Sequence, residues 1–186
     1  QLMWGARSDV GCVRPHNEDS YLVQSPLFCV CDGMGGHAAG EVASSIAVET
    51  IAKTAPQSAD AARLAAAVEA ANAAVIEAAL NGLGKPGMGC TATCAYIEND
   101  TLAIAHVGDS RAYLLHEGTL IRVTRDHSYV EELVDAGEIT ADEARVHPNR
   151  SVITRALGSD PAMYADHFTL HIEEGDRLIL CSDGLS

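Results

Sequence analysis

Residues 20–37, SYLVQSPLFCVCDGMGGH, carry the strongest fold signal in the chain. Two short apolar runs, 21–23 and 27–31, flank a Gln-Ser-Pro turn, and this pattern predicts a β-hairpin. The second strand is expected to end at Asp32. A glycine-rich turn follows and leads into a helix expected over residues 38–54. The hairpin therefore delivers a carboxylate to the end of a strand, next to a flexible turn.

The remaining pattern contains one further long helix and a series of strands. Residues 60–80 are rich in alanine and carry a buried-face stripe at three- and four-residue spacing. The stripe consists of Leu64, Val68, Ala71, Val75 and Ala79. Strands are expected at 91–97, 101–107, 112–116, 119–123, 168–172 and 177–181. This order predicts an α+β fold of one domain, spanning 1–186, with helices covering antiparallel sheets.

Residues 128–150 differ from the rest in composition. They are charged and contain two short helical pieces, 130–136 and 141–146, without a strong apolar stripe. Such a segment is typical of a surface feature rather than of a core. We expect a flap subdomain here, within the larger domain, and we expect it to select substrates.

Charge and hydropathy exclude several classes of partner. Twelve Lys and Arg stand against 26 Asp and Glu, which gives a net charge of −14. Such a field repels phosphate-rich polymers, so nucleic acid is not an expected partner. No apolar run approaches the roughly 20 residues that span a bilayer, and the first residues do not resemble a signal peptide. The sequence therefore predicts a soluble, cytoplasmic protein without a membrane partner.

The six cysteines allow three interpretations: disulfides, a zinc site or buried free thiols. Most lie in apolar, strand-like runs, and their CxC and CxxxC spacings are not the paired CxxC of a structural zinc site. Buried free thiols are the favoured interpretation.

Four aspartates share an unusual setting at or beside expected strand ends. They are Asp19, Asp32, Asp109 and Asp183. Carboxylates gathered at strand ends repel one another unless a hard cation such as Mg²⁺ or Mn²⁺ lies between them. For any single position an ordinary Asp-Gly turn is the alternative. The sequence around all four favours a shared metal site.

Seven strings together identify a family resemblance. In order they are Arg14-Pro-His-Asn-Glu-Asp19, Asp32-Gly-Met-Gly-Gly-His37, Gly89-Cys-Thr-Ala92, Gly108-Asp-Ser-Arg-Ala-Tyr113, Asp126-His-Ser128, Ile153-Thr-Arg-Ala-Leu-Gly158 and Cys181-Ser-Asp-Gly-Leu185. The series resembles the motifs of the type 2C metal-dependent serine/threonine protein phosphatases, in their bacterial branch. The resemblance implies a four-layer αββα sandwich of two antiparallel sheets flanked by helices. Family members continue past the last string, so the C-terminal part of that fold is expected to be missing here.

The resemblance also assigns metal ligands. Asp32 would bridge two Mn²⁺ or Mg²⁺ ions, the Gly33 carbonyl would bind one of them, and Asp183 would bind the other. Asp109 and Asp183 match the acidic pair that holds a third ion in bacterial members. Glu18 and Asp19 would act through metal-bound waters. Two or three ions are therefore expected.

The implied reaction is hydrolysis of phosphoserine and phosphothreonine in proteins by a hydroxide that bridges the metals. Arg14 would grip the substrate phosphate, for which its planar guanidinium is suited, and an ordinary surface arginine is the alternative. His37 has two possible roles, to donate a proton to the leaving group through a water or to cap a helix. His127 is assigned to structure rather than to catalysis.

Partners and alternatives follow from this resemblance. Phosphorylated proteins, the targets of a Ser/Thr kinase, are the expected substrates, and the protein is expected to be a monomer. A pseudophosphatase that binds phosphoproteins without turnover is the alternative function. A phosphatase for small phosphate esters would share the same centre.

Overall fold

The computed structural model describes residues 19–182, and the fold is given for this range. Its elements, in chain order, are β1 (Asp19–Gln24), β2 (Leu27–Met34), α1 (His37–Thr54), α2 (Ala61–Leu80), β3 (Gly89–Cys90), β4 (Ala92–Glu98), β5 (Thr101–Val107), β6 (Arg111–His116), β7 (Thr119–Arg122), α3 (Tyr129–Asp135), α4 (Ala141–Arg145), β8 (Asp166–His171) and β9 (Arg177–Cys181).

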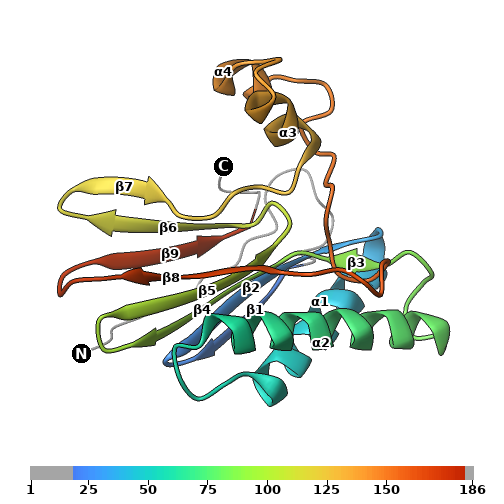
Figure 1. Cartoon of the computed structure of the whole chain (residues 1–186). Helices are drawn as coiled ribbons and strands as arrows, with labels where there is room; N and C mark the ends of the chain where they lie inside the picture. The colour runs from blue at the N-terminus through green and yellow to red at the C-terminus, as the bar shows by residue number, and fades with distance from the viewer. Residues whose placement is uncertain (1–18, 183–186) are drawn as a thin grey trace.

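The strands form two antiparallel sheets. The larger has the order β1-β2-β4-β5-β8, with β3 paired to β2, and the smaller has the order β7-β6-β9. Helices α1 and α2 lie side by side on the outer face of the larger sheet (Figure 1). The predicted α+β sandwich of two antiparallel sheets with flanking helices is confirmed. Residues 19–182 supply the helix layer and both sheet layers.

Alternating side chains of the larger sheet feed two separate cores. In β5, Ala103, Ala105 and Val107 belong to the core between this sheet and the helices, whereas Leu102 and Ile104 belong to the core between the two sheets. All five side chains are fully buried. Because successive residues of a strand point to opposite faces, one strand stabilises both layers.

Helices α1 and α2 contact each other, and alanines make up much of the buried face of α2. The predicted stripe of α2 is buried at Leu64, Val68, Ala71 and Val75. Asp60 caps its N-terminus, where the carboxylate accepts a hydrogen bond of 3.1 Å from the Arg63 N–H. The helix therefore begins one residue after the predicted boundary, at the residue that follows its cap.

Strand β2 is longer than the sequence predicted. It continues past Asp32 to Met34, because the unpredicted strand β3 pairs with its last two residues, Gly33 with Cys90 and Met34 with Gly89. A side chain at Gly89 would meet the Leu157 carbonyl oxygen at 2.4 Å, so only glycine fits this crossing. The end of β2, which carries Asp32, is therefore held by β1 on one side and by β3 on the other.

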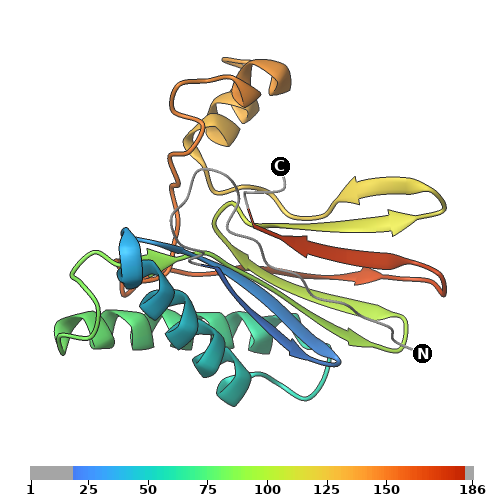
Figure 2. The same cartoon turned by 180° about the vertical axis from the view of Figure 1, so that it is seen from behind.

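Helices α3 and α4 stand apart from both sheets (Figures 1 and 2). Ser128 caps α3, and Thr140 with Glu143 forms a reciprocal capping box at α4. The chain leaves and re-enters the body at one place, where Ser128 pairs with Ile153 and the Tyr129 N–H donates to the Val152 carbonyl over 3.0 Å. The two predicted short helices are confirmed.

The five described cysteines are free and buried, as favoured from their setting. They are Cys29, Cys31, Cys90, Cys94 and Cys181. Cys29 and Cys94 face each other across β2 and β4, with their sulfur atoms 2.9 Å apart. Cys12 lies outside the described residues.

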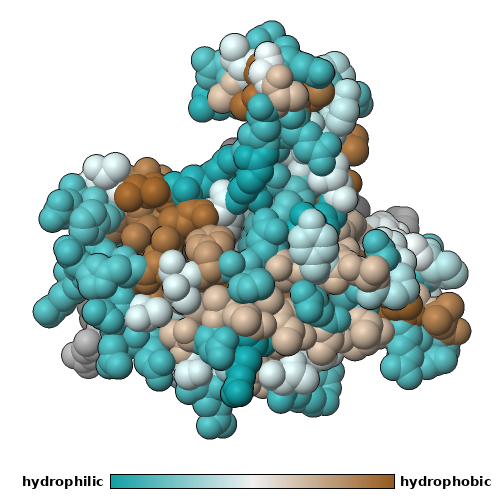
Figure 3. All heavy atoms as spheres, in the orientation of Figure 1, coloured by the Kyte–Doolittle hydropathy of each residue, from teal (hydrophilic) through white to brown (hydrophobic). Residues whose placement is uncertain are grey.

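Hydrophobic side chains gather on the surface over β6, β7 and β9 (Figure 3). Leu120, Ile121 and Ile179 are among the exposed apolar residues of these strands. Within residues 19–182 no helix combines the length and the hydropathy that crossing a membrane requires.

Candidate metal-binding active site

The hairpin places two carboxylates directly opposite each other. Asp19 in β1 and Asp32 in β2 are register partners, so both side chains lie on the same face of the sheet. Asp32 is 5% exposed, and one carboxylate oxygen of each aspartate is shielded from solvent. Like charges in opposite positions repel, and a cation between them would reverse that repulsion.

Thr91 joins this pair to the turn that carries the third aspartate. Its hydroxyl accepts the Asp32 N–H over 3.1 Å and shares a hydrogen bond of 2.5 Å with the Ser110 hydroxyl. Its own N–H donates to the Asp32 carbonyl over 2.9 Å. Asp109, which precedes Ser110, also has a carboxylate oxygen shielded from solvent. We call this set, Asp19, Asp32, Thr91, Gly108, Asp109 and Ser110, the acidic end of the sandwich.

The turn before β6 has no room for a side chain. Gly108 has a φ of +106°, and a Cβ there would lie 2.6 Å from the Thr91 Cγ2. The Gly108 N–H donates to His127 Nδ1 over 2.9 Å, and the Gly108 carbonyl accepts the His127 N–H over 2.8 Å. The position of Asp109 is therefore set by its neighbours on both sides.

A partly buried polar network continues from His127. His127 Nε2 lies 2.7 Å from Asp166 Oδ2, and Arg155 donates to the other carboxylate oxygen of Asp166 over 2.8 Å. Burial lowers the pKa of His127 from its ordinary value, against the opposing effect of Asp166. His106 stacks on the ring with 5.0 Å between centroids, and burial lowers its pKa to about 4. Burial thus favours the neutral form of both rings.

Arg111 fixes the start of β6. Its guanidinium binds the Asp126 carboxylate through two nitrogens, at 3.0 Å and 2.7 Å, and it donates to the Tyr113 hydroxyl over 3.0 Å. These contacts raise the pKa of Arg111 above its ordinary value, chiefly through the hydrogen bonds to Asp126. The guanidinium is thus committed to structure.

The predicted site residues fall into two groups. The structure brings Asp19, Asp32 and Asp109 to the acidic end, with Gly33 next along β2 and opposite Cys90. Arg14, Glu18 and Asp183 lie outside the described residues, as does the side chain of His37. His37 begins α1, and the N-cap position before it is occupied by Gly36.

The donors at the acidic end suit a hard cation. Carboxylate oxygens and a nearby backbone carbonyl are the ligands that Mg²⁺ and Mn²⁺ accept. Asp19, Asp32 and Asp109 do not form a group of three whose ligand atoms all lie within 4.8 Å of one another. Within residues 19–182, the one group of three acidic or histidine ligands with atoms within 4.8 Å of one another is His116, Glu117 and Glu173. The chemistry of the donors, and not a compact group of three ligands, is therefore what fits a divalent cation at the acidic end.

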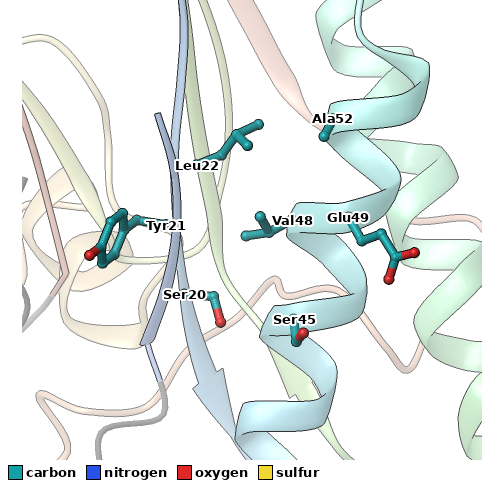
Figure 4. A pocket seen from close by; sticks show the side chains of 7 residues that line it. All are labelled: Ser20, Tyr21, Leu22, Ser45, Val48, Glu49 and Ala52. Atoms are coloured by element: carbon teal, nitrogen blue, oxygen red, sulfur yellow. The ribbon is translucent and has the colours of Figure 1, made fainter. Parts of the chain in front are cut away.

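A surface hollow lies between β1 and α1. Its volume is about 450 Å³, and Figure 4 shows Ser20 and Leu22 pointing toward α1 while Tyr21 points away. The lining residues are Ser20, Tyr21, Leu22, Ser45, Val48, Glu49 and Ala52. The lining has an acidic side chain and no basic one, so it does not suit a phosphate ester.

Sequence reasoning missed the supporting residues of the site. Thr91 and Ser110 stand within the quoted strings but were given no role, and Asp166 stands outside all seven strings. The sequence offered two signals for these residues. Thr91 closes a Gly-x-Thr string, and Ser110 directly follows the candidate ligand Asp109. No pattern in the sequence pointed to Asp166, because its contacts come from residues 39 and 11 positions away.

The family model described as Protein phosphatase 2C matches residues 7–185. The chain belongs to this family. It is 44% identical to the serine/threonine protein phosphatase PstP of Mycobacterium tuberculosis over 191 residues, which cover all of this chain and 36% of that protein. It is 38% identical to the serine/threonine phosphatase stp of Listeria welshimeri, covering 97% of this chain and 76% of that one.

Solved structures of family members share the fold. A crystal structure of M. tuberculosis PstP superposes with a TM-score of 0.90 at 43% identity, covering 97% of this chain and 77% of that chain. The catalytic domain of PstP in complex with two manganese ions superposes with a TM-score of 0.86 at 41% identity, covering 97% and 76%. The chain thus spans little more than a third of full-length PstP and about three quarters of its crystallised domain.

Proposed function

We propose that this chain carries the catalytic core of a metal-dependent phosphatase that hydrolyses phosphoserine and phosphothreonine in proteins. The observation that carries the proposal is the acidic end, where Thr91 links Asp32, the register partner of Asp19, to Ser110 in the turn that carries Asp109. Family members named as serine/threonine phosphatases support the same activity.

Mn²⁺ or Mg²⁺ is the proposed cofactor. Asp32 would bridge two ions, with the Gly33 carbonyl on one and Asp183 on the other, and Asp109 would share a third ion with Asp183. Glu18 and Asp19 would orient the cluster through waters. When bound, the ions supply positive charge and the Lewis acidity that activates water against a phosphate ester. The two manganese ions in the PstP catalytic domain support this assignment.

Two residues act on the substrate in this proposal. Arg14 binds the phosphate through its planar guanidinium, which offsets the repulsion expected from a chain of net charge −14. His37 delivers a proton, through a water, to the leaving oxygen of the serine or threonine. The free thiols take no part, because the described cysteines are buried in the core.

The segment 128–150 is the proposed substrate-selecting flap within one catalytic domain, 1–186. Its two helices stand apart from the sheets, so a protein substrate can contact them without disturbing the core (Figures 1 and 2). Exchanging this segment is expected to alter peptide preference and to leave hydrolysis of a small aryl phosphate nearly unchanged.

The proposed setting is cytoplasmic signalling. The chain would act as a monomer on targets of a Ser/Thr kinase, without a nucleic-acid or membrane partner. Its net charge of −14 supports the first of these exclusions.

The decisive test uses the full-length protein with Mn²⁺, p-nitrophenyl phosphate and a phosphothreonine peptide. Phosphate release that requires Mn²⁺ and stops with a chelator is the expected result. Absence of release under these conditions rejects the proposal. Calorimetry distinguishes the alternatives, because a pseudophosphatase would bind the phosphopeptide without metal and without turnover. A preference for small esters over every phosphopeptide would redirect the assignment to small phosphate esters.

A further inference from the structure

One residue binds both backbone groups of Gly108. The imidazole Nδ1 of His127 accepts the Gly108 N–H over 2.9 Å, and the backbone N–H of His127 donates to the Gly108 carbonyl over 2.8 Å. On its other side Gly108 lies against Thr91, so closely that a Cβ at this position would be 2.6 Å from the Thr91 side chain. The residue before Asp109 is thus held between His127 and Thr91.

The hydrogen bonds define the tautomer of His127. Because Nδ1 accepts an N–H, the neutral ring carries its proton on Nε2 and donates it to Asp166 Oδ2, 2.7 Å away. Arg155 binds the second carboxylate oxygen of Asp166 and keeps the acceptor in place. The wrong tautomer would place two N–H groups against each other.

The surroundings of His127 suit a positioning role rather than proton transfer. Its side chain is 8% exposed, both ring nitrogens are engaged, and the His106 ring stacks on it. His106 is itself held by the Thr93 hydroxyl and the Arg125 carbonyl, each at 2.9 Å. A ring fixed in this way can orient its neighbour.

We propose that His127, oriented by Asp166, is a positioning residue that clamps Gly108 and thereby holds the Asp109 carboxylate at the acidic end. The proposal rests on the proposed metal-dependent function and assigns a role within that same site. The histidine of the Asp-His-Ser string thus supports a metal ligand through the backbone of the residue before it.

Two substitutions separate the clamp on Gly108 from the contact with Asp166. In His127→Asn the amide oxygen can take the place of Nδ1 and accept the Gly108 N–H, but the link to Asp166 is lost. In His127→Gln the longer amide reaches toward Asp166, but Gly108 loses its acceptor. Both variants keep the hydrogen bond from the backbone N–H of residue 127 to the Gly108 carbonyl, so they form a matched pair.

The test measures Mn²⁺ affinity by calorimetry on the full-length protein, with thermal unfolding of the metal-free protein as the control. The Gln variant is expected to bind its weakest Mn²⁺ about tenfold less tightly, the size typical for loss of a residue that orients a ligand, and the Asn variant less than threefold. Raising Mn²⁺ is expected to restore most of the lost turnover of the Gln variant. A purely structural role would not produce this rescue.

Equal Mn²⁺ affinities in the two variants, or affinity losses that follow only the losses in melting temperature, would overturn the proposal. If either variant fails to fold, nitrogen-15 NMR of the metal-free wild-type protein decides. A His127 ring protonated on Nε2 and bare at Nδ1 supports the clamp, and a proton on Nδ1 rules it out. A wild-type protein without phosphatase activity would reject the proposed function, while the order of Mn²⁺ affinities would still test the clamp.

Discussion

The acidic end and the segment 128–150 are held in place by different kinds of contact. At the acidic end, residues from three distant parts of the chain meet, and Thr91 links Asp32 to Ser110 within 3.1 Å. In the segment, the helix ends are set largely by neighbours three residues away, such as Glu143, which Thr140 binds in the capping box. The acidic end therefore has little tolerance for substitution, whereas the segment 128–150 can vary without disturbing the sandwich.

The largest effect is expected from Asp32→Asn. Removing one carboxylate charge from the proposed bridging ligand is expected to lower turnover of p-nitrophenyl phosphate about 1000-fold, or roughly 4 kcal/mol. The rise in melting temperature that Mn²⁺ gives the wild-type protein should shrink as well, because the folded state loses metal affinity. Steady-state kinetics and thermal unfolding with and without Mn²⁺ measure both effects.

Asp142→Asn is the matched control from the segment, since the Asp142 side chain is 88% exposed. It is expected to leave both turnover and the Mn²⁺-dependent stabilisation unchanged. If the two variants lose activity equally, the proposed division between the acidic end and the segment is wrong.

A second pair of substitutions compares Gly108, at the acidic end, with Gly137, in the segment 128–150. Gly108→Ala combines a positive φ of +106° with a Cβ contact of 2.6 Å to Thr91, whereas Gly137 has a φ of +74° and open space around it. We expect Gly108→Ala to cost about 3 kcal/mol from backbone strain and overpacking, and Gly137→Ala about 1 kcal/mol from strain alone. Urea unfolding measures both, and equal losses would show that Thr91 moves aside.

The buried histidine next to the acidic end predicts a pH effect. Burial lowers the pKa of His106 to about 4, compared with roughly 6.5 in an unfolded chain. Between these values the unfolded state takes up a proton that the folded state does not bind. Falling pH therefore costs stability, at most about 1.4 kcal/mol per pH unit for this group.

His106→Gln removes that titration. The difference in unfolding free energy between wild type and variant should shrink as pH falls from 6.5 toward 4.5, as measured by urea unfolding at several pH values. His116 provides a contrast, because its hydrogen bond to Asp176 raises its pKa. The stability that this hydrogen bond contributes is fully present below the ordinary pKa of histidine and is lost as pH rises. Parallel profiles of unfolding free energy against pH for wild type and His106→Gln would show that His106 is not the source of the pH effect.

Local patterns in the sequence were sufficient for most of the fold. The hairpin, the stripe of α2 and the short helices α3 and α4 depend on neighbours in the sequence, and each lies within a few residues of its predicted bounds. Strand β3 was missed because it has two residues, and its pairing with β2 depends on Gly89 fitting against Leu157. Spacing within one segment carries no information about such a crossing.

The candidate site was predictable only in part, for a related reason. Asp19, Asp32 and Asp109 could be proposed because each stands in a recognisable string. The contacts that hold them, from Thr91, His127 and Asp166, join residues up to 59 positions apart. These residues come within hydrogen-bond distance only in the folded protein, so the sequence alone does not show their contacts.

The smallest effect is expected in the segment itself, from Thr140→Ala. The substitution removes the hydroxyl that accepts the Glu143 N–H over 3.1 Å, at a cost of about 1 kcal/mol to α4. Because few contacts tie α4 to the sheets, this loss should remain local and speed amide hydrogen exchange in residues 141–145 roughly fivefold. Thr140→Ser keeps the cap and should exchange like the wild type. Turnover of p-nitrophenyl phosphate should be the same in all three proteins, and a drop in the alanine variant would mean that the cap of α4 supports the acidic end.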